Sequence, residues 1–151
     1  MPTASELLTE EERQDLANNA ALLSWTYTPM DAENFVLGVT ARDGTIFHLW
    51  CQHDRYGVMP PAWHWFNPET NARDQAGDIP KGGLFFHGNK VICAPWNRLA
   101  YSAIDSRGPH GDWELANWRE NPKTGACLTL SAMALRIHCE LNAVSFQGRI
   151  P

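Results

Sequence analysis

The sequence predicts a single α+β domain with an N-terminal helix, an antiparallel meander of three to four strands, a long loop and a C-terminal helix. Two observations lead to this prediction. Apolar residues at helical spacing lie near the two ends of the chain, and β-rich runs separated by turn residues lie between them. Strands that are grouped between helices, rather than alternating with them, favour an antiparallel sheet. The 151 residues, 44% of them hydrophobic, suffice for one core, so we expect residues 1–151 to form one domain.

The first helix is predicted from a start signal and an apolar pattern. Thr9-Glu10-Glu11-Glu12 fits a capping box, in which the Thr hydroxyl accepts from the amide three residues on and Glu12 reaches back. Leu16, Ala20 and Leu23 follow at helical spacing, so this helix should run to about Leu23. The same spacing predicts an amphipathic C-terminal helix from Leu130, Met133, Ala134, Ile137 and Leu141.

The strands are predicted from β-rich runs and the turn residues between them. Alternating apolar residues at 35–39 and a second run at 46–51 flank Asp43-Gly44, which predicts an antiparallel hairpin. A third run covers residues 62–66, and the chain should return to the core at 84–93. The meander is the simplest arrangement of these runs.

Two long segments lack any such periodicity. Asn67–Gly83 is rich in Gly, Pro, Asp and Asn, so we expect a surface loop there. Residues 97–125 form another irregular stretch around Gly108-Pro109-His110-Gly111, and loops of this length are usually functional or mobile. Large aromatic residues are concentrated in the same part of the chain: Trp63, Trp65, Trp96, Trp113 and Trp118. They should form core or hold the loops against it, and a surface that docks a partner is the alternative.

Charge and composition exclude several classes of protein. The formal net charge is -5 and the Lys and Arg residues are scattered, so nucleic acid is not expected as a partner. No apolar run approaches the roughly 20 residues that span a bilayer, and the acidic N-terminus has the wrong sign for a targeting peptide. We therefore expect a cytoplasmic protein with no membrane contact. Its four cysteines include no CxxC pair and should be free thiols.

Two stretches of the chain carry a resemblance to a known family. Residues 46–66, IFHLWCQHDRYGVMPPAWHWF, contain a strand, a tyrosine-containing break, a double proline and an aromatic strand. His87-Gly88-Asn89 and Val91-Ile92-Cys93 follow. With the order of elements over roughly residues 33–142, they resemble the ubiquitin-conjugating (E2) fold and family, in which a His-Pro-Asn motif precedes a strand that ends in the active-site cysteine.

The chain departs from the family pattern in three ways. Gly88 stands where the family usually has proline, Cys93 comes only four residues after Asn89, and one substantial helix follows the long loop. This trimmed form resembles the prokaryotic E2-like proteins that are encoded beside E1-like, ubiquitin-like and deconjugating-peptidase genes, including antiphage conjugation systems.

The resemblance implies a function for three residues. Cys93 would accept a ubiquitin-like protein from an E1-like adenylating enzyme as a thioester and pass it to an amine on a target protein. Asn89 would donate to the developing oxyanion or organise the adjacent loop, and His87 would tie the loop by hydrogen bonds rather than act as a base. No cofactor and no metal are expected, because ATP is consumed at the E1. The surface that meets the E1 should include the N-terminal helix.

Other interpretations of the same residues stay open. Asp105, His110 and Asp112 lie in the long loop, where each could face the thioester or be solvated. A non-catalytic module that only binds a ubiquitin-like protein is disfavoured, because such variants typically lack the cysteine. The remaining cysteines Cys51, Cys127 and Cys139 are expected to be buried thiols. A zinc site, with separations that match no standard motif, would draw on His87, Cys93, His110, Cys127, His138 and Cys139.

Overall fold

The computed structural model describes residues 3–86 and 90–151, and it has the predicted α+β layout. An N-terminal helix, a four-stranded antiparallel sheet and a C-terminal helix follow one another along the chain. The strands are neighbours in chain order, so the sheet is a simple meander. The elements are α1 (Ala4–Leu23), β1 (Thr26–Pro29), β2 (Asn34–Thr40), β3 (Ile46–Gln52), β4 (Ala62–Phe66) and α2 (Leu130–Leu141).

The sheet buries one face against the helices. Residues 35, 37 and 39 of β2 are fully buried, and Leu37 pairs with Leu49 of β3, which confirms the predicted hairpin. Gly44 has a φ of +87° in the turn between them, a conformation that glycine adopts without steric cost. Because side chains alternate along a strand, these positions share a face with Trp63 and Trp65 of β4, and all belong to the main core.

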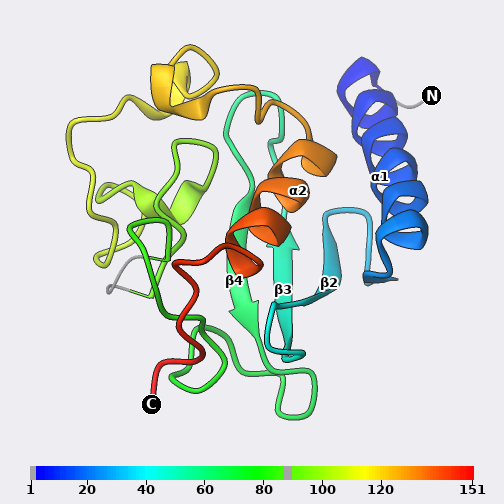
Figure 1. Cartoon of the computed structure of the whole chain (residues 1–151). Helices are drawn as coiled ribbons and strands as arrows, with labels where there is room; N and C mark the ends of the chain where they lie inside the picture. Colours follow the sequence, from blue (N-terminus) through cyan, green and yellow to red (C-terminus); the bar gives the residue numbers. More distant parts are fainter. Residues whose placement is uncertain (1–2, 87–89) are drawn as a thin grey trace.

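The two helices complete this core. Figure 1 shows α2 in front of the sheet and α1 beside it, with the long loops on the side opposite α1. Leu16 and Ala20 of α1 are buried in the core, as predicted. On α2 all five residues of the predicted apolar stripe are buried: Leu130, Met133, Ala134, Ile137 and Leu141.

The first helix starts earlier than predicted. The capping box is formed by Thr3 and Glu6, whose side chains exchange hydrogen bonds with each other's backbone at 3.1 and 2.7 Å, and Thr9 lies inside the helix. The pattern Thr-x-x-Glu therefore occurs twice, and the upstream copy is the one used. Glu12 instead accepts hydrogen bonds from Tyr56 Oη (2.7 Å) and from the backbone N of Leu130 (2.9 Å). Its carboxylate thus ties α1 to the start of α2.

The sheet has a fourth strand that no run in the sequence indicated. It is β1, Thr26–Pro29, a short and largely exposed edge strand with no apolar alternation by which a sequence pattern would reveal it. The described residues 84–86 and 90–93 return to the core as predicted, since Phe85, Phe86 and Ile92 are buried in it. They make the isolated bridges Gly82–Phe86 and Phe86–Ile92. The predicted surface loop 67–83 is partly packed as well, since Ile79 is only 1% exposed.

The tryptophans act as predicted. Those at 63, 65, 96 and 118 are at most 1% exposed, and the one at 113 is partly buried against the core. The rings of Trp63 and Trp96 meet edge to face with their centroids 6.4 Å apart. The contact fixes the segment that follows Cys93 to strand β4.

Candidate functional site

Cys93 stands where a buried segment reaches the surface. The two residues before it, Val91 and Ile92, are at most 1% exposed, whereas Cys93 is partly exposed. Its backbone N donates to the carbonyl of Phe85 at 2.9 Å. The backbone is therefore held in place while the thiol remains open to a partner.

The side chain of Asn97 holds this segment in place through buried hydrogen bonds to the backbone. Asn97 is fully buried; its Oδ1 accepts from the backbone N of Trp63 (3.0 Å), and its Nδ2 donates to the carbonyl of Ile92 (2.9 Å). It also begins the 3-10 helix Arg98–Ala100 by accepting from Leu99 N. One amide thus joins β4 to the residue before Cys93, and nothing in the sequence pattern marked it.

Replacing Asn97 with alanine should lower the free energy of unfolding by about 2 to 4 kcal/mol, because it leaves two buried backbone groups, Trp63 N–H and Ile92 C=O, without a partner. Urea denaturation measures the change. Asn121→Ala is the matched control, since Asn121 caps the short 3-10 helix Pro122–Thr124 in an exposed setting. Asn121→Ala should lower the free energy of unfolding by about 1 kcal/mol or less. An equal loss in both variants would contradict the role given to Asn97.

Arg98 fixes the same segment to the double proline. Arg98 is buried; its Nε donates to the carbonyl of Pro60 (2.9 Å), and its guanidinium binds both the carboxylate (2.9 Å) and the carbonyl (2.6 Å) of Asp54. Its backbone N donates to the carbonyl of Pro61. The motif that breaks the chain before β4 and the segment after Cys93 are therefore one structural unit.

His110 contacts the thiol. Its Nε2 lies 3.2 Å from Cys93 Sγ, and its Nδ1 lies 3.3 Å from Asp112 Oδ1. The imidazole stacks on the indole of Trp113, with centroids 3.4 Å apart and planes inclined by 7°. The backbone of His110 bonds to Ala100 and Ser102 on the neighbouring segment. Stacking and backbone bonds together aim the ring at Cys93.

A glycine makes this approach of the loop possible. A Cβ on Gly108 would lie 2.6 Å from the carbonyl carbon of Tyr101 and 2.7 Å from its oxygen, which is closer than Cβ atoms come to backbone. Any larger residue would push the loop away from Tyr101. This explains why the Gly-Pro-His-Gly stretch has glycine two residues before the histidine.

Burial governs the ionisation of Cys93. It raises the pKa of the thiol, and the positive charge of Lys123 offsets only part of the rise. The thiol is therefore protonated at neutral pH and needs a base to become nucleophilic. With Asp112 accepting from Nδ1–H of His110, the lone pair of Nε2 faces the thiol; this tautomer is assigned from the hydrogen bonds. The geometry thus allows a proton to pass from Cys93 Sγ to His110 Nε2, with Asp112 hydrogen-bonded to the other ring nitrogen.

Three other residues named from the sequence are His87, Asn89 and Asp105. His87 and Asn89 lie outside the described residues, so their roles stay predictions. Asp105 binds Arg107 at 2.8 Å, which lowers the pKa of its carboxyl, and Arg107 reaches on to Asp74 at 3.3 Å. Among the three polar loop residues named from the sequence, His110 contacts Cys93, Asp112 contacts His110, and Asp105 is paired with Arg107.

The remaining thiols differ in burial. Cys51 is fully buried, and burial raises its pKa well above the ordinary value. Cys127 is half-buried, and burial raises its pKa too. The prediction of a buried thiol is wrong for Cys139, which lies exposed on α2 because it falls between the buried positions of the helical stripe.

The zinc site finds no support in the described part of the chain. Cys93 and His110 meet, but the ring of His138 is engaged elsewhere, since its Nδ1 accepts from Trp25 Nε1 at 3.0 Å. Across residues 3–86 and 90–151, no three His, Cys, Asp or Glu side chains are grouped as metal ligands.

We compared the chain with known protein families, curated proteins and solved structures. No protein-family description, no curated protein and no solved structure matches it. Within the described ranges, neither α1 nor α2 has the length and apolar character to cross a bilayer. The function must therefore be inferred from the geometry around Cys93 and from the motifs of the sequence.

Proposed function

We propose that this protein is an E2-like conjugating enzyme that carries a ubiquitin-like protein as a thioester on Cys93 and passes it to an amine on a target. The observation that carries the proposal is the contact between the partly exposed Cys93 thiol and His110 Nε2 at 3.2 Å. A thiol with a base in contact is the arrangement that nucleophilic acyl transfer requires.

Charging of Cys93 would proceed by thioester exchange. The Cys93 thiol gives its proton to His110 Nε2, and the sulfur attacks the carbonyl carbon of the thioester on the E1-like enzyme. A new C–S bond forms, the old one breaks, and the departing E1 thiolate takes the proton from His110. Asp112 stabilises the imidazolium that exists in between. The step consumes no oxidant and needs no cofactor on this chain.

Discharge would use His110 again, now to carry a proton from the attacking amine to the sulfur of Cys93. The target amine attacks the thioester carbonyl, a C–N bond forms and the bond to Cys93 sulfur breaks. The amine proton passes to His110 and then to the departing sulfur, which returns both side chains to their starting state. Asn89 is the proposed oxyanion donor or loop organiser, and His87 the proposed loop tie, as the family resemblance implies.

The fold part of the proposal draws on the order of the elements. The chain has an N-terminal helix, a four-stranded meander and a C-terminal helix, with a double proline before the last strand and Cys93 in the loop that follows. This order supports the proposal because it resembles that of the E2 family. The resemblance of residues 33–142 is to the prokaryotic E2-like proteins, of the kind found in antiphage conjugation systems. The partners of this protein would then be an E1-like enzyme, a ubiquitin-like protein and a target.

A second candidate follows from the same contact. A cysteine paired with a histidine that is in turn bonded to an aspartate is also the arrangement of cysteine hydrolases. Both activities pass through an acyl group on Cys93, and they differ in whether an amine or water attacks it. The rate of discharge with and without amine separates them.

The decisive experiment mixes this protein with its cognate E1-like enzyme, the ubiquitin-like protein and ATP. We expect an adduct of the summed mass on non-reducing gels that disappears with thiol, and whose discharge accelerates when a primary amine is added. If the E1-like enzyme is charged but no adduct forms here, the proposal is wrong. Discharge at one rate, whether or not amine is present, would favour the hydrolase.

A further inference from the structure

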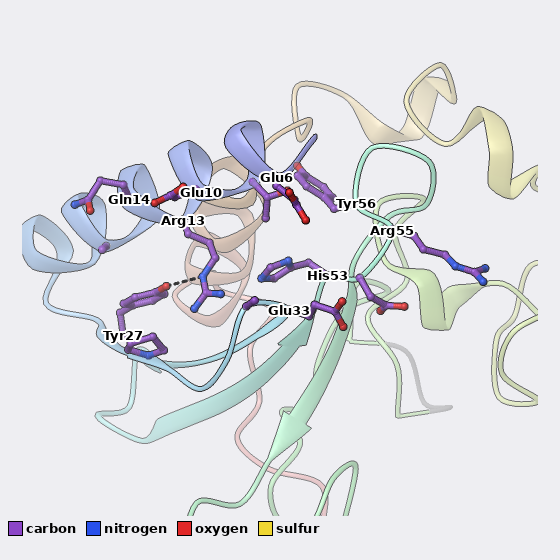
Figure 2. Close-up of a pocket in the computed structure, with 14 residues that line it drawn as sticks. Glu6, Glu10, Arg13, Gln14, Tyr27, Glu33, His53, Arg55 and Tyr56 are labelled. Carbon is purple, nitrogen blue, oxygen red and sulfur yellow. Dashed lines mark hydrogen bonds between the residues drawn. The ribbon is translucent and has the colours of Figure 1, made fainter. Parts of the chain in front are cut away.

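A groove lies between α1 and the ends of the strands, and it shares no lining residue with the Cys93 site. It has a volume of about 630 Å³, which falls within the usual range for small-molecule sites. Figure 2 shows Glu6, Glu10 and Arg13 on α1, with His53 below them and Tyr56 beside Glu6; His53 and Tyr56 follow β3.

A buried histidine beneath this groove has a ring nitrogen that bonds to none of the described residues. His53 is 3% exposed, and within the described residues its Nε2 makes no hydrogen bond. The ring points from the end of β3 towards α1 in Figure 2, and it packs on the ring of Phe35 with the centroids 5.8 Å apart. Burial lowers the pKa of His53 to about 4, helped by the charge of Arg13, so the ring is neutral at pH 7. A neutral imidazole offers one nitrogen as an acceptor.

The unused polar groups of the groove are mainly acceptors. Arg55 also lines the groove, but its side chain points away from Glu10 and Glu33 in Figure 2 and its Nη1 lies 3.9 Å from Met59 Sδ. The guanidinium of Arg13 donates hydrogen bonds to Tyr27 Oη and to the carbonyls of Asp31 and Asn34. The carboxylates of Glu10 and Glu33 line the groove from opposite sides without a hydrogen bond or ion pair to the described residues. A ligand that fits must therefore supply donors and positive charge.

We propose that this groove binds a free small molecule that carries a guanidinium group. A guanidinium presents five N–H donors in a planar fork, which suits two carboxylates on opposite walls and a ring nitrogen beneath them. Glu10 and Glu33 hold the charge, and His53 accepts one donor. The inference does not depend on acyl transfer at Cys93.

Isothermal titration calorimetry with agmatine as the probe tests this site, and the imidazole ¹⁵N signals of the protein report on His53. We expect saturable one-site binding and a shift of the His53 ring signal. The double variant Glu10→Gln/Glu33→Gln should bind about five- to tenfold more weakly, since each exposed charge pair contributes modestly. Cys93→Ala should bind agmatine like the unchanged protein.

Glu11→Gln is the matched control, because Glu11 is exposed on the same helix but does not line the groove. It should leave the affinity unchanged. The proposal is overturned by the absence of saturable binding up to about 10 mM agmatine. It is also overturned if Glu11→Gln weakens binding as much as the double variant does, or if a short arginine-containing peptide binds and agmatine does not.

Discussion

Replacing Cys93 with alanine should abolish the thiol-sensitive adduct completely. The physical reason is that Cys93 is a partly exposed thiol with an imidazole nitrogen at 3.2 Å, so it can both meet the donor thioester and lose its proton. Non-reducing gels and intact-protein mass spectrometry of the charging reaction measure the outcome. Cys93→Ser should trap an oxyester that survives thiol, because a serine ester is less prone to thiol exchange than a thioester.

The other three cysteines are internal controls for this experiment. Cys51 is fully buried, and Cys127 is half-buried with its thiol directed to the carbonyl of Ala132 at 3.8 Å. Cys139 is exposed, yet no described histidine is hydrogen-bonded to it. Alanine at each of these positions should leave the adduct intact. Loss of the adduct in Cys139→Ala with retention in Cys93→Ala would move the nucleophile to α2.

Replacing His110 with glutamine should slow charging of Cys93 by about 10²- to 10⁴-fold at pH 7. The base is needed because burial raises the pKa of the Cys93 thiol, so few molecules carry the thiolate without help. As pH rises towards that pKa the thiol ionises by itself, and the defect should shrink. Single-turnover charging between pH 6 and about 10 measures this, with the variant's rate rising with pH more steeply than that of the unchanged protein.

The control for His110 is another histidine with a carboxylate partner. His64 Nδ1 lies 2.7 Å from Asp74 Oδ2, in a part of the sheet that does not contact Cys93, so His64→Gln should charge at the ordinary rate. Asp112→Asn should give a smaller defect than His110→Gln, because Asp112 acts through the imidazole and is largely exposed. A defect in His110→Gln that stays the same at every pH would mean that the ring positions the loop and does not accept the proton.

The secondary structure was predictable wherever a pattern repeats. The stripe from Leu130 to Leu141 and the hairpin around Gly44 have clear periods, and the structure contains both. The errors came where local signals are duplicated or missing. Two copies of Thr-x-x-Glu compete for the start of α1, and β1 is an exposed edge strand whose residues need no apolar alternation.

The candidate site was predictable only in part. The motifs before Cys93 selected it from four cysteines, and His110 and Asp112 were named as loop residues that could face it. Asn97 was missed, since an asparagine inside a loop has no pattern that distinguishes a buried organiser from a solvated turn. His53 was missed as well, because its burial depends on α1 lying over the end of β3, which the local sequence does not indicate.

The sequence by itself determined the class of the fold, the two helices, the hairpin and the cysteine to test, because each is written in residue types and spacings along the chain. The tertiary structure decided which side chains meet. His110 lies 17 positions after Cys93, and its ring reaches Sγ because Gly108 lets the loop close on Tyr101 and Trp113 stacks on the imidazole. Such a contact depends on how the loops pack against the core, and no spacing of residue types along the chain specifies that packing.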